Sequence, residues 1–323
     1  MNELSCGAMR HRFNFVMAIV RAAKPSSTVQ KQFNHFRFLS LVLVLIPTLA
    51  RAQTSPADFR SETIRFTNPA VGFAAEIEGL LQCPSTPGKH PLVVFIHGSG
   101  QGTRFEYDNL FQLFLNKGFA VFSYDKRGVG KSSGTYNGVG PKNSPMMIPL
   151  LASDAYQAIE TVRNRPNIDS TSIILFGASQ AGWIIPVVAS MTSSVSHFVI
   201  LCGPTVTVGE EIYYSQLAET GNVGIAEAEN RMKAYAGLRG FDPYPYIATQ
   251  KQKGLWIFGA MDHSVPTATS IQLLNSLTPS VKRRNTIKLY PQVGHGLRNP
   301  DTGTFENYEP YMFDWLETNV ARK

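Results

Sequence analysis

Short, uninterrupted apolar runs alternate with helix-like segments along most of this chain, and this alternation constrains the fold more than any other feature. Such runs, bounded by turns, are typical of strands buried on both faces of a parallel sheet. They lie at residues 92–96, 120–122, 173–176, 198–201, 255–258 and 287–290. Helical patterns lie at residues 105–117, 146–163, 180–192, 267–277 and 305–319. Strands that alternate with helices predict βαβ units, and therefore an α/β fold with a mostly parallel, doubly wound sheet.

Two segments depart from this alternation. Near the start, residues 63–67 and 73–81 read as paired strands with a turn between them, so the sheet is expected to begin antiparallel. Later, residues 204–250 form an unusually long connection between two core strands. Its helix-like stretches are residues 208–220 and 224–236. We predict that this connection is a helical cap inserted over the functional site, with a long crossover that has no role in binding as the alternative.

The N-terminal region has the pattern of a secretory leader. Basic residues Lys31 and Arg37 precede an apolar run at 38–46, and a small-x-small sequence follows at 50–52. The apolar run is shorter than the roughly 20 residues that span a bilayer. We therefore expect no stable membrane anchor after cleavage, and an uncleaved N-terminal anchor is the alternative.

This pattern divides the chain into a leader and one large domain. We predict a signal peptide over residues 1–52, cleaved between Ala52 and Gln53, and an α/β domain over residues 53–323. The protein is then expected to be secreted or periplasmic. Because the stretch before the apolar run is long for a signal peptide, a start further downstream, for instance at Met17, is also open.

The net charge of +7 is concentrated in the leader. Residues 1–52 hold seven Lys and Arg residues and one acidic residue, so the rest of the chain is close to neutral. A nearly neutral domain gives no electrostatic reason to expect nucleic acid as a partner. Hydrophobic residues make up 43% of the chain and charged residues 16%, which suits a large buried core rather than a disordered chain.

Beyond the leader the sequence has two cysteines, Cys83 and Cys202. They fall on segments predicted as separate strands, where buried free thiols are expected, although export would permit a disulfide. Neither cysteine has the spacing of metal ligands, and no His/Cys cluster suggests zinc. We therefore expect no metal.

The strongest local signal is a serine that directly follows a predicted strand. The sequence Gly-Ala-Ser-Gln-Ala-Gly occupies residues 177–182 and leads into a predicted helix. A tight strand-to-helix turn through Gly-x-Ser-x-small is the context of a nucleophile elbow. Small residues two positions before and after the serine let the chain pass closely, and Gly177 and Ala181 meet that demand. Ser179 is therefore the predicted nucleophile.

A glycine-rich turn follows an earlier predicted strand, with His-Gly-Ser-Gly-Gln-Gly at 97–102. Acyl transfer places negative charge on the substrate's carbonyl oxygen, and preorganised N–H groups must meet it. The backbone N–H groups of Ser99 and of Gln180, just after the nucleophile, are predicted to form this oxyanion hole. His97 lies in the turn and precedes the serine, so a structural role is favoured over that of a general base.

The general base is predicted to be His295. It lies in a Gly-His-Gly loop just beyond the last predicted strand, where the flanking glycines allow the loop to present an imidazole to Ser179. Its task is to take the serine proton and return it to the leaving group. His263 is the competing candidate, because it adjoins the predicted acid.

The acid that orients the base is predicted to be Asp262. It follows the strand predicted at 255–258, and the resulting order Ser, Asp, His is that expected for a catalytic triad on a fold of this class. Asp242 and Asp301 are alternative acids, although for both a solvated loop position is favoured.

One further stretch, residues 124–134, contains Gly-x-Gly-Lys-Ser and superficially resembles a phosphate-binding loop. It lacks the full P-loop spacing and follows the wrong strand for a first βα turn. A structural interpretation is favoured, in which Asp125 and Arg127 pin a turn beside the site.

Taken in order along the chain, these motifs resemble the α/β-hydrolase superfamily, specifically exported bacterial esterases and the serine aminopeptidase-like branch. The motifs that carry the resemblance are residues 97–100, 124–132, 177–183, 259–266 and 294–295, and it extends over roughly residues 60–320. One departure is Ala181, where the family usually has glycine.

The resemblance implies a two-step reaction without a cofactor. Ser179 would attack an ester or amide carbonyl, His295 would act as base and then acid, and Asp262 would orient it. A small-molecule carboxylic ester is the favoured substrate, as for a carboxylesterase. One alternative is an aminopeptidase-like peptidase, in which Glu210 and Glu211 could hold an amine. Another is a hydrolase fold that has lost catalysis and serves as a binding module.

Overall fold

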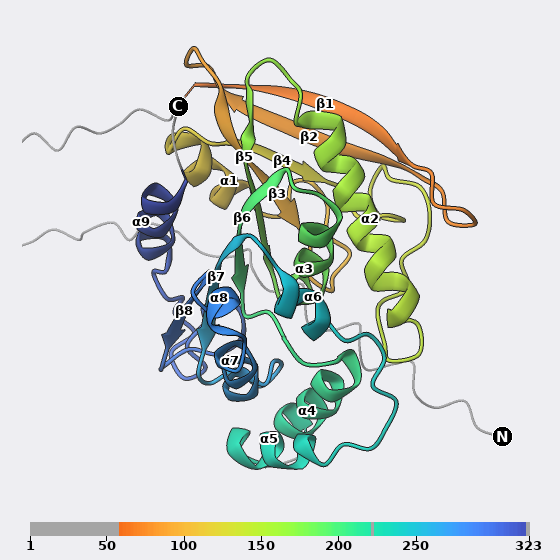
Figure 1. The fold of residues 1–323 in the computed structure, drawn as a ribbon, viewed down its shortest axis with the longest axis vertical. Coiled ribbons are helices and arrows are strands. Elements are labelled where there is room, and N and C mark those ends of the chain that lie inside the picture. Colours follow the sequence, from red (N-terminus) through yellow and green to blue (C-terminus); the bar gives the residue numbers. More distant parts are fainter. Residues whose placement is uncertain (1–57, 221–222, 321–323) are drawn as a thin grey trace, which may run out of the picture. The chain divides into compact units, whose positions relative to one another are not determined.

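The computed structural model describes residues 58–220 and 223–320. The predicted signal peptide and its cleavage site therefore lie outside the described residues. An eight-stranded sheet has the order β1-β2-β4-β3-β5-β6-β7-β8 (Figure 1). The strands are β1 Phe59–Asn68, β2 Ala75–Pro84, β3 His90–Ile96, β4 Ala120–Tyr124, β5 Ile168–Ala178, β6 Val195–Leu201, β7 Lys253–Gly259 and β8 Asn285–Tyr290.

The sheet has the predicted antiparallel start and parallel body. β1 pairs antiparallel with β2, β2 pairs antiparallel with β4, and every later pairing is parallel. The sequence pattern explains the difference between the two parts. Ile64 and Phe66 of β1 alternate with exposed residues, whereas β3 is buried along its whole length. β1 thus covers the core with one face only, while β3 is covered on both faces.

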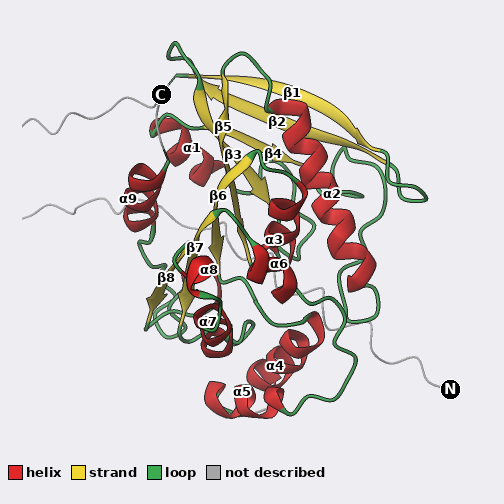
Figure 2. Ribbon diagram, in the orientation of Figure 1, coloured by secondary structure: helices red, strands yellow, loops and turns green. Residues whose placement is uncertain are grey.

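Helices pack on both faces of the sheet, as Figure 2 shows. The main helices are α1 Asp108–Asn116, α2 Ser144–Val162, α3 Ala181–Met191, α7 Thr267–Asn275 and α9 Glu309–Asn319. One apolar cluster joins α2, α3 and α7 to the sheet, through residues such as Ile148, Ile184 and Leu274. A second cluster joins α1 and α9 to the opposite face, through residues such as Phe114 and Phe313. This is the doubly wound architecture that the alternating pattern predicts.

The predicted helices agree with the structure except near some of their ends. α5 (Ile225–Lys233) ends at Lys233 rather than at residue 236, and α7 ends at Asn275 rather than at residue 277. α9 begins at Glu309 rather than at residue 305, because Pro310 has no N–H to donate and fits only in the first turn. α1 begins at Asp108 rather than at residue 105, because the chain before it forms a loop that is hydrogen-bonded to the turn after β4. The short helices α6 Tyr244–Thr249 and α8 Pro279–Lys282 were not predicted.

The long connection between β6 and β7 carries the helices α4 Val208–Thr220, α5 Ile225–Lys233 and α6. Tyr214 of α4 and Met232 of α5 belong to a small apolar cluster of their own. The buried carboxylate of Glu229 accepts the N–H groups of Ala268 and Thr269, at 2.9 and 3.1 Å. Because these are the first-turn donors of α7, Glu229 ties the connection to the N-terminus of that helix.

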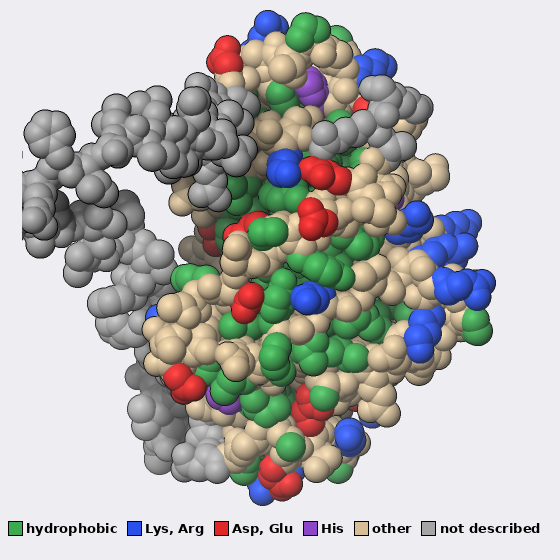
Figure 3. Space-filling view, turned by 90° about the vertical axis from the view of Figure 1, so that its left-hand side faces the viewer, with side chains coloured by type: hydrophobic (Ala, Val, Ile, Leu, Met, Phe, Trp, Pro, Cys, Tyr) green, Lys and Arg blue, Asp and Glu red, His purple; other side chains and the backbone are tan. Residues whose placement is uncertain are grey.

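Surface and cysteine features fit the composition of the domain. Figure 3 shows acidic, basic and hydrophobic side chains interspersed over one face, with Lys and Arg side chains gathered along one edge. Within residues 58–220 and 223–320, none of the helices has the length and hydropathy needed to cross a membrane. Cys83 and Cys202 are buried free thiols, as predicted.

Candidate active site

Ser179 occupies the sharp turn between β5 and α3. Its φ of 56° lies in the left-handed region, which non-glycine residues seldom adopt. Its N–H donates to the carbonyl of Leu201 at 2.9 Å and so fastens the turn to the end of β6. A backbone of this kind at a functional residue is the strained turn expected of a nucleophile elbow.

Gly177 and Ala181 explain how the elbow tolerates alanine in place of the usual glycine. A Cβ at Gly177 would lie 2.5 Å from both the carbonyl oxygen of Ile96 and the Cβ of Ala181. Only glycine therefore fits at 177, and its missing side chain leaves the space that the methyl group of Ala181 occupies. The departure from the family pattern is accommodated within the turn.

The glycine-rich loop after β3 lies beside Ser179. A Cβ at Gly98 would stand 3.8 Å from the Cβ of Ser179 and 3.5 Å from the carbonyl oxygen of Ala178. Across the described ranges 58–220 and 223–320, the N–H groups of Ser99 and Gln180 have no hydrogen-bond acceptor. Two free N–H groups near the serine are the requirement for an oxyanion hole.

Asp262 and His295 come together from the loops after β7 and β8. His295 Nδ1 donates to Asp262 Oδ2 at 2.9 Å. The other carboxylate oxygen, Oδ1, accepts the N–H groups of Ser264 and Val265, both at 2.8 Å. Asp262 is fully buried, whereas about a third of the His295 side chain is exposed. The carboxylate is thus fixed by its own loop and, through Nδ1, holds the imidazole in a defined orientation.

Two glycines allow these loops to approach so closely. A Cβ at Gly259 would lie 2.4 Å from the carbonyl oxygen of Val293, and one at Gly294 would lie 2.7 Å from that of Met261. The N–H of Met261 donates to the carbonyl of Val293 at 2.9 Å. The acid and base loops therefore pack backbone against backbone, which side chains at 259 and 294 would prevent.

Electrostatics favour the charged form of His295. Burial is the largest single effect and lowers its pKa, but the charge and hydrogen bond of Asp262, together with the Glu211 and Glu219 carboxylates, raise it by more in sum, so the net pKa lies above the ordinary value. Among the described residues, no hydrogen bond joins His295 to Ser179 Oγ. Contacts of this kind often tighten only when substrate is bound.

The competing candidates from the sequence lie elsewhere or have other partners. His263 is exposed, and Asp242 and Asp301 are exposed loop residues. His97 Nε2 donates to the carbonyl of Tyr124 at 2.5 Å, and its Nδ1 lies 3.4 Å from the Glu106 carboxylate. His97 thus has the structural role favoured by the sequence.

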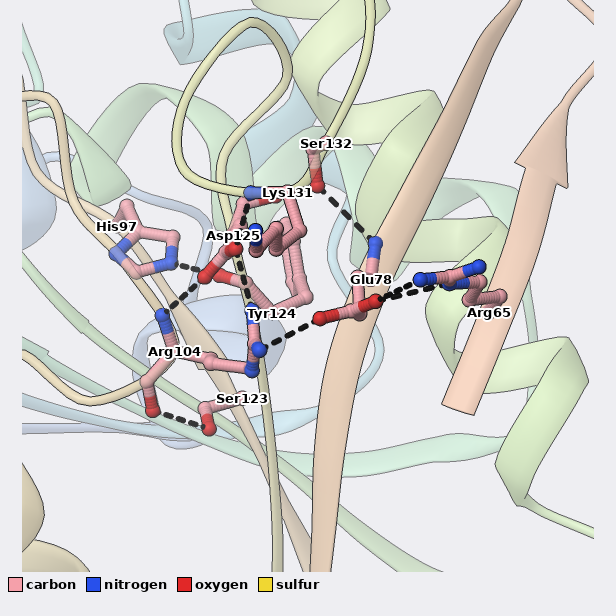
Figure 4. Close-up of polar contacts among 9 residues, drawn as sticks. All are labelled: Arg65, Glu78, His97, Arg104, Ser123, Tyr124, Asp125, Lys131 and Ser132. Carbon is pink, nitrogen blue, oxygen red and sulfur yellow. Dashed lines mark hydrogen bonds and ion pairs between the residues drawn. The ribbon is translucent and has the colours of Figure 1, made fainter. Parts of the chain in front are cut away.

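The turn after β4 contains a network of buried charged groups (Figure 4). The Asp125 carboxylate accepts the N–H of Arg104 and the N–H of Lys131, both at 2.8 Å, and pairs with the Arg104 guanidinium. Arg104 also pairs with Glu78 of β2 at 2.6 Å. As predicted, Asp125 pins a turn, and the N–H of Lys131 is used within the turn rather than offered to a phosphate. Arg127 pairs with the buried Asp154 of α2, at 2.6 Å.

Lys126 and Tyr136 were not predicted to belong to the site. Lys126 is buried, and its Nζ donates to the carbonyls of Gly98 and Gly100, at 2.7 and 3.2 Å, and to Gln180 Oε1 at 3.0 Å. Tyr136 donates its hydroxyl to the carbonyl of Ser99 at 2.9 Å. A lysine between two turn-pinning residues, directly after a buried strand, was the available signal.

Helix α4 contacts the acid loop. The Tyr214 hydroxyl donates to the carbonyl of Asp262 at 2.5 Å, and Ser264 Oγ donates to Glu219 at 2.7 Å. The pKa of Glu211, one turn before Tyr214, is shifted by charged groups of the same site. Burial raises its pKa to about 8, His295 opposes this rise, and the Asp262 and Glu219 carboxylates add to it.

Three side chains near the site also have the spacing of a metal-binding group. Within the described part of the chain, one such group is found, formed by Cys202, Asp262 and His295 with their ligand atoms within 4.8 Å of one another. Burial raises the pKa of the Cys202 thiol to about 12, and Asp262 and His295 already bind each other. Because metals prefer a thiolate, this donor set fits a metal poorly.

Comparison with known proteins identifies the family of the chain. The sequence matches the prolyl oligopeptidase family over residues 105–323, more than half of the chain. The chain belongs to this family. The serine aminopeptidase-like branch suggested by the motifs is not confirmed by the match, whereas the α/β-hydrolase superfamily is.

Curated relatives and solved structures include several kinds of hydrolase. Human acyl-coenzyme A thioesterase 1 is 25% identical over 262 residues, covering 76% of this chain and 56% of that protein. The uncharacterized Escherichia coli K12 protein YfhR is 29% identical over 129 residues, covering 39% of this chain and 41% of that protein. The chain thus spans about half the length of the curated relatives it matches.

The solved structures share the fold at low identity. An acetyl xylan esterase from Paenibacillus sp. R4 is 18% identical with a TM-score of 0.53, covering 82% of this chain and 90% of that one. The Pyrococcus horikoshii acylaminoacyl peptidase is 17% identical with a TM-score of 0.59, covering 81% of this chain and 42% of that one. The family and these neighbours support a serine hydrolase with the α/β-hydrolase fold.

Proposed function

We propose that this protein hydrolyses a small carboxylic ester, with Ser179 as nucleophile, His295 as general base and acid, and Asp262 as the group that orients His295. Two observations carry the proposal: the strained turn at Ser179, and the hydrogen-bonded pair of the buried Asp262 carboxylate and the His295 imidazole. These are the groups needed to activate a hydroxyl near neutral pH.

The proposed reaction has two steps. Ser179 Oγ attacks the carbonyl carbon while His295 takes its proton, and the N–H groups of Ser99 and Gln180 stabilise the oxyanion. The ester C–O bond breaks as His295 passes the proton to the leaving alcohol. Water then adds to the acyl-enzyme with His295 again as base, and the carboxylic acid and free Ser179 are regenerated.

The first experiment is labelling with a fluorophosphonate probe, beside turnover of p-nitrophenyl acetate. Wild-type protein should react with both. In Ser179→Ala and His295→Ala, kcat/KM should fall by about 10⁴-fold or more, since each variant removes one member of a unit that acts together.

His263→Ala is the matched control, because His263 is exposed and adjoins Asp262. It should keep wild-type turnover. A folded wild-type protein that neither labels nor cleaves any ester would contradict the proposal and would favour the non-catalytic binding module. Loss of activity in His263→Ala would instead reassign the base.

An aminopeptidase-like activity is the second candidate, and Glu211 is the residue that bears on it. Glu210 accepts the N–H and hydroxyl of Thr207 and pairs with Arg239, so it serves the start of α4. Glu211 would have to hold a substrate amine alone. With a pKa raised to about 8 by burial, it is largely uncharged at neutral pH, which favours a neutral ester over an amine.

This choice can be tested by comparing p-nitrophenyl acetate with an aminoacyl p-nitroanilide. The ester should be turned over with the higher kcat/KM, and Glu211→Gln should leave ester KM within about threefold of wild type. A higher kcat/KM for the anilide, lost in Glu211→Gln, would establish the peptidase instead.

Export is a separate part of the proposal and is supported by the leader pattern alone. If the protein is secreted or periplasmic, N-terminal sequencing of the material outside the cytoplasm should begin at Gln53. A membrane-bound product that retains residues 1–52 would favour the uncleaved anchor.

A further inference from the structure

We propose that Lys126 is the positioning residue of the oxyanion hole, because its buried ammonium binds the chain segments that carry both oxyanion donors. This assignment rests on the proposed function. Lys126 lies in the turn after β4 and has no place in the Ser-His-Asp triad. Its role would be to orient the N–H groups of Ser99 and Gln180 rather than to contact substrate.

The contacts of Lys126 converge on the glycine-rich loop. Nζ donates to the carbonyl oxygens of Gly98 and Gly100, at 2.7 and 3.2 Å, and the backbone N–H of Lys126 donates to the carbonyl of Gly102 at 3.1 Å. The loop thus wraps around one lysine. Loops of this composition are conformationally free unless something binds their backbone.

The geometry of a peptide unit explains how this contact orients an N–H group. The carbonyl of Gly98 and the N–H of Ser99 belong to the same planar trans peptide and point in opposite directions. When Nζ draws the carbonyl of Gly98 toward the protein interior, the N–H of Ser99 must face the other way. Because a Cβ at Gly98 would lie 3.8 Å from the Cβ of Ser179, we take that direction to be the side of the nucleophile.

The second donor is held by the same ammonium. Nζ donates to Gln180 Oε1 at 3.0 Å, and Gln180 is buried at the start of α3. Tyr136 completes the arrangement, because its hydroxyl donates to the carbonyl of Ser99 at 2.9 Å and lies 3.3 Å from Gln180 Oε1. The lysine also lies 3.6 Å from the centre of the Tyr136 ring, which favours a cation.

The environment explains why a charged group is used here. Within residues 58–220 and 223–320, the hydrogen bonds of the Lys126 ammonium are all to uncharged oxygens. Burial lowers its pKa to about 7, and the Glu106 carboxylate opposes this effect, so the ammonium form that can donate to all three oxygens is present at and below about neutral pH. Hydrogen bonds from a charged donor are roughly twice as strong as neutral ones. One ammonium can therefore fix several carbonyls that a neutral side chain would hold weakly.

The test compares Lys126→Met with Tyr136→Phe, using Lys89→Met as the matched control. Methionine keeps the apolar stem and removes the ammonium, and Lys89 is an exposed surface lysine. With p-nitrophenyl acetate, kcat should fall about 10- to 100-fold in Lys126→Met while KM stays within about threefold. Tyr136→Phe should lose less, about two- to tenfold, and Lys89→Met nothing.

A second measurement, which should stay unchanged if Lys126 only stabilises the fold, is the inhibition constant of a trifluoromethyl ketone. Ser179 Oγ adds to its carbonyl carbon, His295 takes the proton, and the ketone oxygen becomes an oxyanion that only a formed hole stabilises. Its inhibition constant should rise in Lys126→Met by the same factor as kcat/KM falls.

The outcomes separate the two proposals. If wild-type protein shows no Ser179-dependent turnover, the proposed function fails and this assignment fails with it. If wild type is active but Lys126→Met keeps kcat and ketone affinity within twofold, the assignment alone is overturned. If Lys126→Met does not fold, Tyr136→Phe decides: unchanged kcat and ketone affinity would overturn the assignment, and a parallel loss of both would support it.

Discussion

The acid–base side of the candidate site and its oxyanion side are built in different ways. Asp262 and His295 meet through two loops whose backbones touch directly, and the carboxylate is held by N–H groups of its own loop. The oxyanion side instead depends on buried charged side chains, Asp125, Lys126 and Arg127, which reach other strands and helices.

This difference determines where each side is sensitive. On the acid–base side the orientation of the imidazole rests on a single carboxylate, so a change of one atom should affect chemistry strongly and stability weakly. On the oxyanion side Asp125 and Arg127 are buried and ion-paired, so removal of either leaves an uncompensated charge, whereas removal of Lys126 leaves three uncharged oxygens without a donor. Substitutions there should lower the stability of the fold. They should also lower the rate, either because less protein is folded or because the oxyanion donors are displaced.

The largest expected effect is on the acid–base side, in Asp262→Asn. The amide is nearly isosteric but cannot hold the tautomer that places a proton on Nδ1 and leaves Nε2 free to accept one from Ser179. We expect kcat/KM for p-nitrophenyl acetate to fall by about 10⁴-fold, with a melting temperature near that of wild type. Activity within tenfold of wild type would mean that another acid orients His295 and would remove the contrast between the two sides.

The next largest effect is expected on the oxyanion side, in Arg127→Met. Both Arg127 and Asp154 are buried, and they pair at 2.6 Å. Methionine would leave the Asp154 carboxylate buried without its partner, so the free energy of unfolding in urea should fall by about 3–5 kcal/mol.

The matched control for this prediction is Arg231→Met. Arg231 pairs with Glu227 across one turn of α5, but both side chains are about half exposed, so its loss should cost no more than about 0.5 kcal/mol. The double variant Arg127→Met/Asp154→Leu should recover part of the stability lost in Arg127→Met. If it is no more stable than the single variant, Arg127 stabilises the fold by packing rather than by charge.

A smaller effect should appear in the pH dependence of the rate. The base must be neutral, and the Asp262 carboxylate holds the pKa of His295 above its ordinary value despite burial. The rate should therefore be lost as pH falls through a midpoint above about 6.5. In Asp262→Asn the residual activity should show a lower midpoint. A wild-type midpoint below 6.5, measured where circular dichroism shows an intact fold, would contradict the proposed pairing.

The two sides also differ in how far the sequence alone predicts them. Ser179, Asp262 and His295 each directly follow a core strand within a short motif, and the parallel sheet brings the ends of those strands to one edge. Their approximate placement therefore follows from local patterns and topology. The assignment of Ser99 and Gln180 rests on the same logic and stays a prediction.

Contacts between distant segments could not be predicted in this way. Lys126 and Tyr136 bind a loop almost thirty residues or more away in the chain, and a lysine in a turn is usually solvated. The capping of α7 by Glu229 is likewise invisible in the sequence, because it joins α5 to a helix about forty residues later. The short helix α6 was missed because its Pro- and Tyr-rich sequence has no helical periodicity.

The smallest expected effect concerns the contact between α4 and the acid loop, and Tyr214→Phe tests it. The variant removes the hydroxyl that donates to the carbonyl of Asp262 but keeps the buried ring in its apolar cluster. One hydrogen bond of this kind contributes about 1 kcal/mol, so the free energy of unfolding should fall by that amount and kcat by less than threefold. Tyr213→Phe is the control, because the Tyr213 ring stacks on Tyr235 without a hydroxyl contact among the described residues, and it should change neither quantity. A tenfold loss of kcat in Tyr214→Phe alone would show that α4 helps to hold Asp262 in place, and the acid–base side would then depend on distant side chains as much as the oxyanion side does.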